Sequence, residues 1–203
     1  MSLYFYFHPD LHHRRSIRLN GYDYSQAGLY FITICTHERQ CVFGEVITGE
    51  MVLNPLGDIA YRVWHTLPER FPTISLDAFI VMPNHIHAIL VLNETIPHEN
   101  VGAGLAPAQP DEVPSTPISE HTDGNGRAGA SPAPTVSAVI GVYKSLVYKE
   151  CLAIFKSRNE TMGKLWQRNY HEHIIRNQPA YEKITDYILA NPQKWEQDSL
   201  YQR

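Results

Sequence analysis

Two histidines stand one residue apart in the stretch "VMPNHIHAIL", residues 81–90. Residues i and i+2 of a β-strand point to the same face, so a strand here would present His85 and His87 side by side, with Ile86 turned to the core. Two imidazole nitrogens that converge in this way suit a divalent metal ion. A His-x-His pair alone also fits ordinary surface or core histidines, and the chain holds a second pair in "HEH", residues 171–173.

A tyrosine and an asparagine near the C-terminus could add to the same chemistry. Tyr187 and Asn191 in "DYILANP" are four residues apart, which places them on one face of a helix. The amide of Asn191 can offer a carbonyl oxygen to a hard metal ion, and Tyr187 can offer a phenol. Each residue also has a structural interpretation, because Tyr187 lies at core spacing and Asn191 precedes Pro192, as is common at helix ends.

The segments that must position these residues alternate between strand and helix patterns. We expect strands over 29–37, 75–82 and 86–92, a strand-like segment over 165–177, a hairpin over 41–54, and helices over 55–71, 135–156 and 178–192. The hairpin should turn at Gly49-Glu50, and Pro83-Asn84 should separate two strands. Ser137 is a candidate helix cap, Pro179 should begin the last helix, and Pro192 should end it before a short tail. This mixture of hairpins and helices predicts an α+β domain built on an antiparallel sheet.

The length of 203 residues is sufficient for one domain with an insertion. Residues 93–134 are rich in Pro, Gly, Ala, Ser and Thr and have no periodicity, which indicates a flexible insertion within a single domain spanning 1–203, although a linker between two small domains is the alternative. The net charge is −4, and the insertion holds six acidic residues and one basic residue. The charge of the chain therefore neither supports nor excludes binding to nucleic acid.

Other features bear on the compartment. No apolar run approaches the length of a membrane span, and the N-terminus lacks the pattern of a signal peptide. The three cysteines are an odd number at spacings that match no motif, which fits a reducing cytoplasm.

Several motifs together resemble a known family. "MPNHIHAIL", "LWQRNYHEHIIRN" and "DYILANP" occur in this order, and the opening "RRSIRLNGYDYSQAGLYFITICTHERQCVFGEV" precedes them. Over residues 14–92 and 135–195 the chain is similar to the HUH single-tyrosine transposases of bacterial insertion sequences, most of all to the REP-associated tyrosine transposases. His87 and Tyr187 are 100 residues apart, and the insertion accounts for 42 of these, which leaves a spacing close to that of compact family members.

The resemblance implies a ferredoxin-like or RRM-like antiparallel sheet with helices on one face and a C-terminal helix that carries the tyrosine. It implies that His85 and His87 are metal ligands, that Asn191 supplies a third, and that Tyr187 is the nucleophile. The metal implied is Mg²⁺ or Mn²⁺. The reaction implied is cleavage and strand transfer of single-stranded or hairpin DNA through a 5′-phosphotyrosine, by a monomer or a homodimer in the bacterial cytoplasm, associated with the nucleoid.

Contacts to DNA would need cations and exposed aromatic rings. The candidates for such contacts are Arg14, Arg15, Arg18, Lys144, Trp166, Arg168 and Arg176, with Tyr22 and Tyr170 as further stacking candidates. Ordinary surface charges and core aromatics would account for the same residues. Two other functions remain open at this point: a hairpin-DNA binding protein with little transfer activity, and a structural metal-binding domain.

Overall fold

The computed structural model describes residues 26–94 and 134–201. Residues from both flanks of the expected insertion form one compact unit. Residues 95–133 of the expected insertion 93–134 lie outside the described residues. The candidate DNA contacts Arg14, Arg15 and Arg18 and the candidate stacking residue Tyr22 lie outside them as well.

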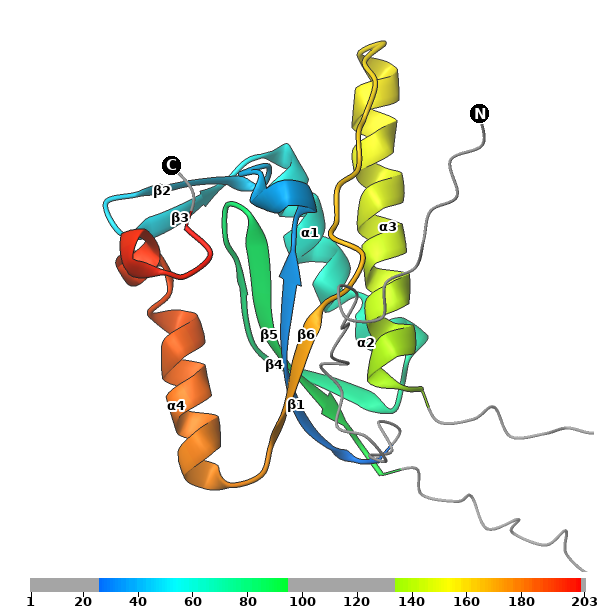
Figure 1. Cartoon of the computed structure of the whole chain (residues 1–203). Helices are drawn as coiled ribbons and strands as arrows, with labels where there is room; N and C mark the ends of the chain where they lie inside the picture. Colours follow the sequence, from blue (N-terminus) through cyan, green and yellow to red (C-terminus); the bar gives the residue numbers. More distant parts are fainter. Residues whose placement is uncertain (1–25, 95–133, 202–203) are drawn as a thin grey trace, which may run out of the picture. The chain divides into compact units, whose positions relative to one another are not determined.

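A four-stranded antiparallel sheet is the centre of this unit (Figure 1). Its strands are β1 (Gly28–Cys35), β4 (Ile74–Val81), β5 (His85–Leu92) and β6 (His171–Ile175), arranged in the order β4-β5-β1-β6. The first and third of these strands are therefore neighbours in the middle, and the second and fourth form the edges. This is the strand order of a split β-α-β, ferredoxin-like sheet, and it confirms the predicted α+β architecture.

Helices cover both faces of the sheet. The helices α1 (Pro55–His65) and α3 (Val136–Ser157) pack on the face formed by the alternate residues Tyr30, Ile32, Ile34, Ile86, Ala88 and Leu90. The C-terminal helix α4 (Gln178–Leu189) packs on the opposite face, against Ile89 and Ile175. Ile86 is fully buried in the larger core, as expected for the residue between the two histidines. The pleat thus turns apolar side chains toward α1 and α3 and turns both histidines toward α4.

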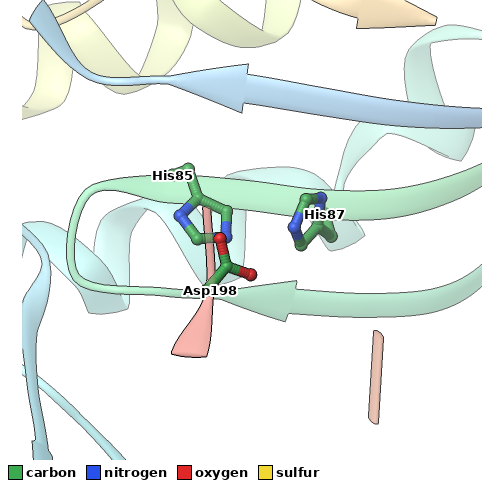
Figure 2. Close-up of side chains that lie close together, drawn as sticks. All are labelled: His85, His87 and Asp198. Carbon is green, nitrogen blue, oxygen red and sulfur yellow. The ribbon is translucent and has the colours of Figure 1, made fainter. Parts of the chain in front are cut away.

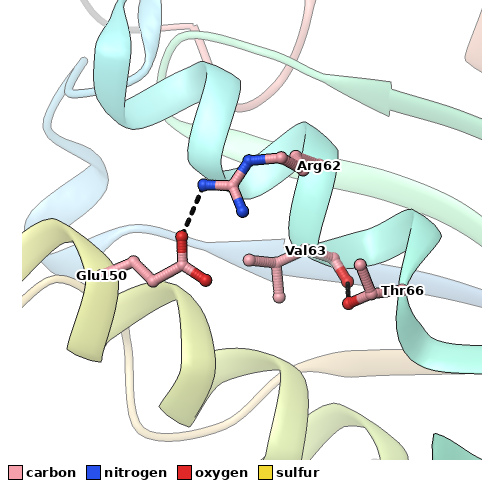
Figure 3. Close-up of polar contacts among 4 residues, drawn as sticks. All are labelled: Arg62, Val63, Thr66 and Glu150. Carbon is pink, nitrogen blue, oxygen red and sulfur yellow. Dashed lines mark hydrogen bonds and ion pairs between the residues drawn. The ribbon is translucent and has the colours of Figure 1, made fainter. Parts of the chain in front are cut away.

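Helix α1 is capped at its start and is joined to α3 by an ion pair. Asn54 caps α1 by accepting hydrogen bonds from the amides of Leu56 and Gly57. Arg62 of α1 forms an ion pair with Glu150 of α3 (Figure 3). The predicted helix over 55–71 is interrupted at Thr66, whose hydroxyl donates to the carbonyl of Val63 at 2.9 Å, and continues as the short α2 (Leu67–Arg70).

A separate two-stranded hairpin of β2 (Gly44–Ile47) and β3 (Glu50–Leu53) lies between β1 and α1 in the chain. Its turn contains Thr48 and Gly49, both with positive φ, close to the predicted break. A single 3-10 turn, η1 (His37–Arg39), precedes it.

Three local predictions are wrong. Thr135 rather than Ser137 caps α3, because the Thr135 hydroxyl accepts from the amide of Ala138. Only His171–Ile175 of the segment 165–177 forms a strand, and Trp166 adds an isolated bridge to Thr36.

The third error concerns the C-terminus. The helix α4 ends at Leu189, and Pro192 begins a 3-10 helix, η2 (Pro192–Gln197), in what was expected to be a short tail. Within the described part of the chain, no helix is both long enough and apolar enough to span a membrane.

Candidate metal centre

Strand β5 supplies the two histidines of the site. His85 and His87 lie at its start with their ring centroids 4.4 Å apart, which confirms that alternate strand residues share a face. The two side chains are 0% and 3% exposed. They were expected on an open face, but they are buried because α4 and the C-terminal segment close over them.

A carboxylate completes this pair. Asp198 is the residue directly after η2, and its carboxylate lies beside the two imidazoles (Figure 2). One ligand atom of each of the three side chains lies within 4.8 Å of the others. Sequence patterns did not indicate this residue, because a single Asp beyond a helix has no spacing relation to a strand motif more than a hundred residues earlier. Only the path of η2, which returns the chain to the sheet, brings Asp198 there.

Tyr187 lies at the edge of this cluster. Its Oη is 3.1 Å from Nε2 of His87 and 3.0 Å from Oδ2 of Asp198. Its ring meets Phe31 edge to face, with centroids 6.2 Å apart. The side chain is 41% exposed, so the phenol contacts the buried cluster on one side and solvent on the other. The phenol can therefore contact the buried cluster and a molecule outside it at the same time.

Asn191 lies at the same site and is 2% exposed. Its Nδ2 donates to Oδ2 of Asp198 at 2.9 Å, which leaves its Oδ1 directed away from that carboxylate. Oδ1 of Asn191 and Nε2 of His85 are both buried without a hydrogen-bond partner among the described residues. A buried acceptor without a partner costs about 1–3 kcal/mol. Two such acceptors beside an imidazole and a carboxylate fit a divalent cation, for which all four groups are suitable ligands.

The electrostatics of the site keep the histidines neutral. Burial lowers the pKa of His85 to about 4, partly opposed by the charge of Asp198. Burial, helped by His85, lowers the pKa of His87 to about 3. Neutral imidazoles are the form that binds metal. For Asp198, burial acts to raise the pKa, but hydrogen bonds from the Leu200 amide and the Asn191 side chain outweigh it and hold the pKa below its ordinary value.

The tyrosine is held in its protonated form. Burial raises the pKa of Tyr187 to about 12, and the charge of Asp198 and its hydrogen bond to the phenol add to the rise. An ionised carboxylate can only accept a hydrogen bond, so the phenol donates to Asp198.

The predicted DNA-contacting residues fall into two groups. Arg168 and Arg176 are exposed, and Arg176 directly follows β6. Lys144 donates to the carbonyls of Gln167 and Arg168 at 2.6 and 3.3 Å, and Trp166 donates its Nε1 to the carbonyl of Lys144. The polar atoms of Lys144 and Trp166 therefore attach the segment before β6 to α3. Tyr170, also a stacking candidate, donates its hydroxyl to Glu172.

Comparisons with known proteins identify relatives of both the sequence and the fold. No protein-family model matches the chain. An uncharacterized protein of Haemophilus influenzae is 38% identical over 196 residues, which covers 96% of this chain and 97% of that protein. The solved structure of a REP-associated tyrosine transposase bound to a REP hairpin matches with a TM-score of 0.52 and 18% identity, over 86% of this chain and 72% of that one.

A Deinococcus radiodurans protein described as a candidate transposase matches with a TM-score of 0.43 and 15% identity, over 85% of this chain and 95% of that one. A TM-score below one half does not establish a common fold. The chain belongs to one family with the Haemophilus influenzae protein, and its fold is that of the REP-associated tyrosine transposases.

Proposed function

We propose that the protein is a transposase that cleaves and rejoins single-stranded or hairpin DNA, with Tyr187 as its nucleophile. The observation that carries this proposal is the position of the Tyr187 phenol, 3.1 Å from Nε2 of His87 and beside the acidic side chain of Asp198. A purely structural metal-binding domain would not need a half-exposed tyrosine at its ligands.

In this reaction Oη of Tyr187 attacks the phosphorus of one phosphodiester in line with the bond that breaks. A bond forms between Oη and phosphorus, the bond to the 3′ oxygen breaks, and the 3′ oxygen takes up a proton. The phenol loses its proton on the side of Asp198, whose Oδ2 already accepts its hydrogen bond at 3.0 Å. The strand is rejoined when a 3′-hydroxyl attacks the phosphotyrosine, and no nucleotide hydrolysis is required because the bond energy is retained.

The groups placed to hold the cofactor, Mg²⁺ or Mn²⁺, are His85, His87, Asp198 and the amide oxygen of Asn191. A divalent cation held there supplies positive charge that neutralises the scissile phosphate and favours the tyrosinate. Two imidazoles are softer ligands than Mg²⁺ prefers, so Mn²⁺ should bind at least as well. With the carboxylate of Asp198, the set of side chains also suits Zn²⁺, since catalytic zinc is held by similar sets of ligands.

The DNA reaches Tyr187 from the exposed side of α4 in this proposal. Arg168 and Arg176 are exposed and free to approach phosphates, and Lys144 and Trp166 would position the segment that carries Arg168. Arg14, Arg15 and Arg18 remain candidates on sequence grounds. The fold match to a transposase bound to a DNA hairpin supports DNA as the partner. A location in the bacterial cytoplasm, near the nucleoid, is part of the same proposal.

A second candidate function is a hairpin-DNA binding protein with little cleavage activity. The observation in its favour is the protonated state of Tyr187, whose pKa is raised to about 12 by burial and by Asp198. Such a phenol attacks slowly unless its surroundings change when metal and DNA bind.

The test is to incubate the protein with labelled single-stranded hairpin DNA and Mn²⁺ and to look for a covalent adduct on a denaturing gel. We expect an adduct with the wild-type protein, none with Tyr187→Phe, and an undiminished adduct with Tyr181→Phe, which removes a phenol from the same helix. An adduct that persists in Tyr187→Phe, or no adduct on any hairpin of a library, contradicts the proposal. Binding without an adduct supports the second candidate.

A further inference from the structure

The two histidines of the cluster have different hydrogen-bond partners on their Nδ1 atoms. Nδ1 of His85 is 2.8 Å from Oδ1 of Asn84, and Nδ1 of His87 is 2.9 Å from the hydroxyl of Thr33. An amide oxygen can only accept a hydrogen bond, whereas a hydroxyl can either donate or accept. Asn84 therefore restricts which nitrogen of His85 carries the proton, whereas Thr33 leaves both positions open on His87.

Asn84 fixes the tautomer of His85. The side chain of Asn84 is fully buried, and its Nδ2 donates to the carbonyl of Leu200 at 2.8 Å. Since a carbonyl can only accept, that end of the amide must be the nitrogen, and the other end must be the oxygen. Oδ1 then requires a donor, so the neutral ring of His85 carries its proton on Nδ1. Its Nε2 is left as a bare lone pair, which agrees with its being buried without a partner in the described part of the chain.

The backbone makes this arrangement rigid. The amide and the hydroxyl of Thr36 both donate to the carbonyl of Asn84, each at 2.9 Å. The amide of Met82 donates to the carbonyl of His85 at 2.8 Å. The turn that carries Asn84 is thus attached to the end of β1 and to the start of β5.

The surroundings of His87 favour the other tautomer. The phenol of Tyr187 donates to Asp198, so its oxygen faces Nε2 of His87 with a lone pair. Two facing lone pairs repel each other, so the contact is favourable only when Nε2 of His87 carries the proton and donates to Oη of Tyr187. Nδ1 of His87 then accepts a hydrogen bond from the hydroxyl of Thr33. For Nε2 of His87 to bind a cation, the same proton must reside on Nδ1, and the Thr33 hydroxyl must rotate to accept it.

We propose that Asn84 and Thr33 are positioning residues with unequal roles: Asn84 presets His85 as a ligand, and Thr33 allows His87 to exchange its tautomer when a cation binds. This proposal rests on the proposed metal centre. The ring of His87 carries one proton before and after the exchange: Nε2 releases its proton to water, and Nδ1 takes up a proton from water. Partners of metal-bound histidines commonly contribute about 10–100-fold in affinity.

The first test is long-range nitrogen–proton NMR on the histidine side chains of the metal-free protein near neutral pH, assigned with His85→Gln and His87→Gln. We expect His85 as the Nδ1–H tautomer and His87 as the Nε2–H tautomer. Adding Zn²⁺, a diamagnetic probe, should change His87 to Nδ1–H and leave His85 unchanged. A metal-free His85 in the Nε2–H form, or a metal-free His87 already in the Nδ1–H form, overturns the proposal.

The second test is Mn²⁺ binding measured from the signal of free Mn²⁺ in electron paramagnetic resonance. Thr33→Val removes the hydroxyl at nearly constant shape and should weaken binding about 10–100-fold, whereas Thr33→Ser should keep the wild-type affinity. Equal affinity of Thr33→Val and Thr33→Ser contradicts the role of Thr33. If the wild-type protein shows the expected tautomers but binds no Mn²⁺, the proposed function fails while the assignment to Asn84 stands.

Discussion

At the scale of single residues, the phenol of Tyr187 is the group whose state decides whether the site can react. Asp198 contributes to its high pKa, because a negative charge beside the phenol disfavours the tyrosinate. Asp198→Asn removes that charge and keeps the size of the side chain. The pKa of Tyr187 should therefore fall below the value of about 12 in the metal-free variant.

This shift can be followed by NMR of tyrosine labelled at the carbon that bears the hydroxyl. Tyr187→Phe identifies the resonance among the 12 tyrosines of the chain. An unchanged or higher pKa of Tyr187 in Asp198→Asn would show that burial alone sets it.

The buried histidines predict how stability depends on pH. Their pKa values in the folded protein, about 4 and about 3, lie below the value of 6.5 for an unperturbed histidine. The unfolded chain therefore binds more protons in acid, so the free energy of unfolding is fully retained above pH 6.5 and falls as the pH decreases toward 4. Each histidine contributes a slope of at most about 1.4 kcal/mol per pH unit.

Urea unfolding of the metal-free protein at several pH values measures this slope. The double variant His85→Gln/His87→Gln should show a flatter dependence below pH 6.5. Its stability above that pH reports the structural cost of the substitutions separately. A wild-type slope equal to that of the double variant would argue that the histidines remain hydrated in the folded protein.

At the scale of elements, two helical glycines have opposite surroundings. A Cβ on Gly57 of α1 would lie 2.1 Å from the carbonyl oxygen of Phe43, the residue before the hairpin, and 2.9 Å from Cδ2 of Leu53, its last residue. A Cβ on Gly141 of α3 would meet no atom of the described residues within 4 Å. Gly57→Ala should destabilise the protein by about 1–3 kcal/mol or more, since the clash is with backbone. Gly141→Ala should stabilise it by about 0.4–1 kcal/mol.

Thermal or urea unfolding of both variants checks the pair, with each serving as the control for the other. The same change in helix propensity applies to both, so the contacts with Phe43 and Leu53 separate them. A mild effect of Gly57→Ala would mean that the hairpin can move away from α1 at little cost.

The elements also show why sequence patterns predicted some parts of the fold and not others. The strand over "HIHAILVL" and the helix over "AYEKITDYIL" depend on local periodicity, and both were predicted. The sequence pattern indicated Ser137 as the cap of α3, whereas the cap is Thr135. Both are cap-forming residues and they lie two positions apart, so residue type alone does not distinguish them. Choosing between them requires the backbone angles at the helix start, which a pattern of residue types does not contain.

At the scale of the whole molecule, the candidate centre joins two distant parts of the chain, strand β5 and the segment from the end of α4 to Asp198. Strand β5 provides His85 and His87, the end of α4 provides Tyr187 and leads to Asn191, and the segment after η2 provides Asp198. Local spacing and a family resemblance indicated the first four residues. Asp198 depends on the return of the C-terminal segment to the sheet, where Asn84 binds the carbonyl of Leu200, and no local signal encodes that path.

Because the candidate ligands come from β5 and from the C-terminal segment, a bound cation should stabilise the folded protein as a whole. A ligand that binds only the folded state at a hundredfold excess over its dissociation constant adds about 2.7 kcal/mol. We expect Mn²⁺ to raise the free energy of unfolding by this amount at that excess. His85→Gln/His87→Gln should abolish the increase, since the unfolded chain has no assembled site.

The same measurement, the free energy of unfolding with and without Mn²⁺, distinguishes the contributions of Asp198 and Asn191. Asp198→Ala should reduce the stabilisation by Mn²⁺ more than Asn191→Ala does, because a carboxylate brings a full charge to the cation and an amide oxygen only a dipole. Each variant also leaves the other residue without its hydrogen bond of 2.9 Å, so the metal-free stability of each provides its baseline. An equal response of both variants and the wild-type protein to Mn²⁺ would place the bound cation elsewhere than between His85, His87 and Asp198.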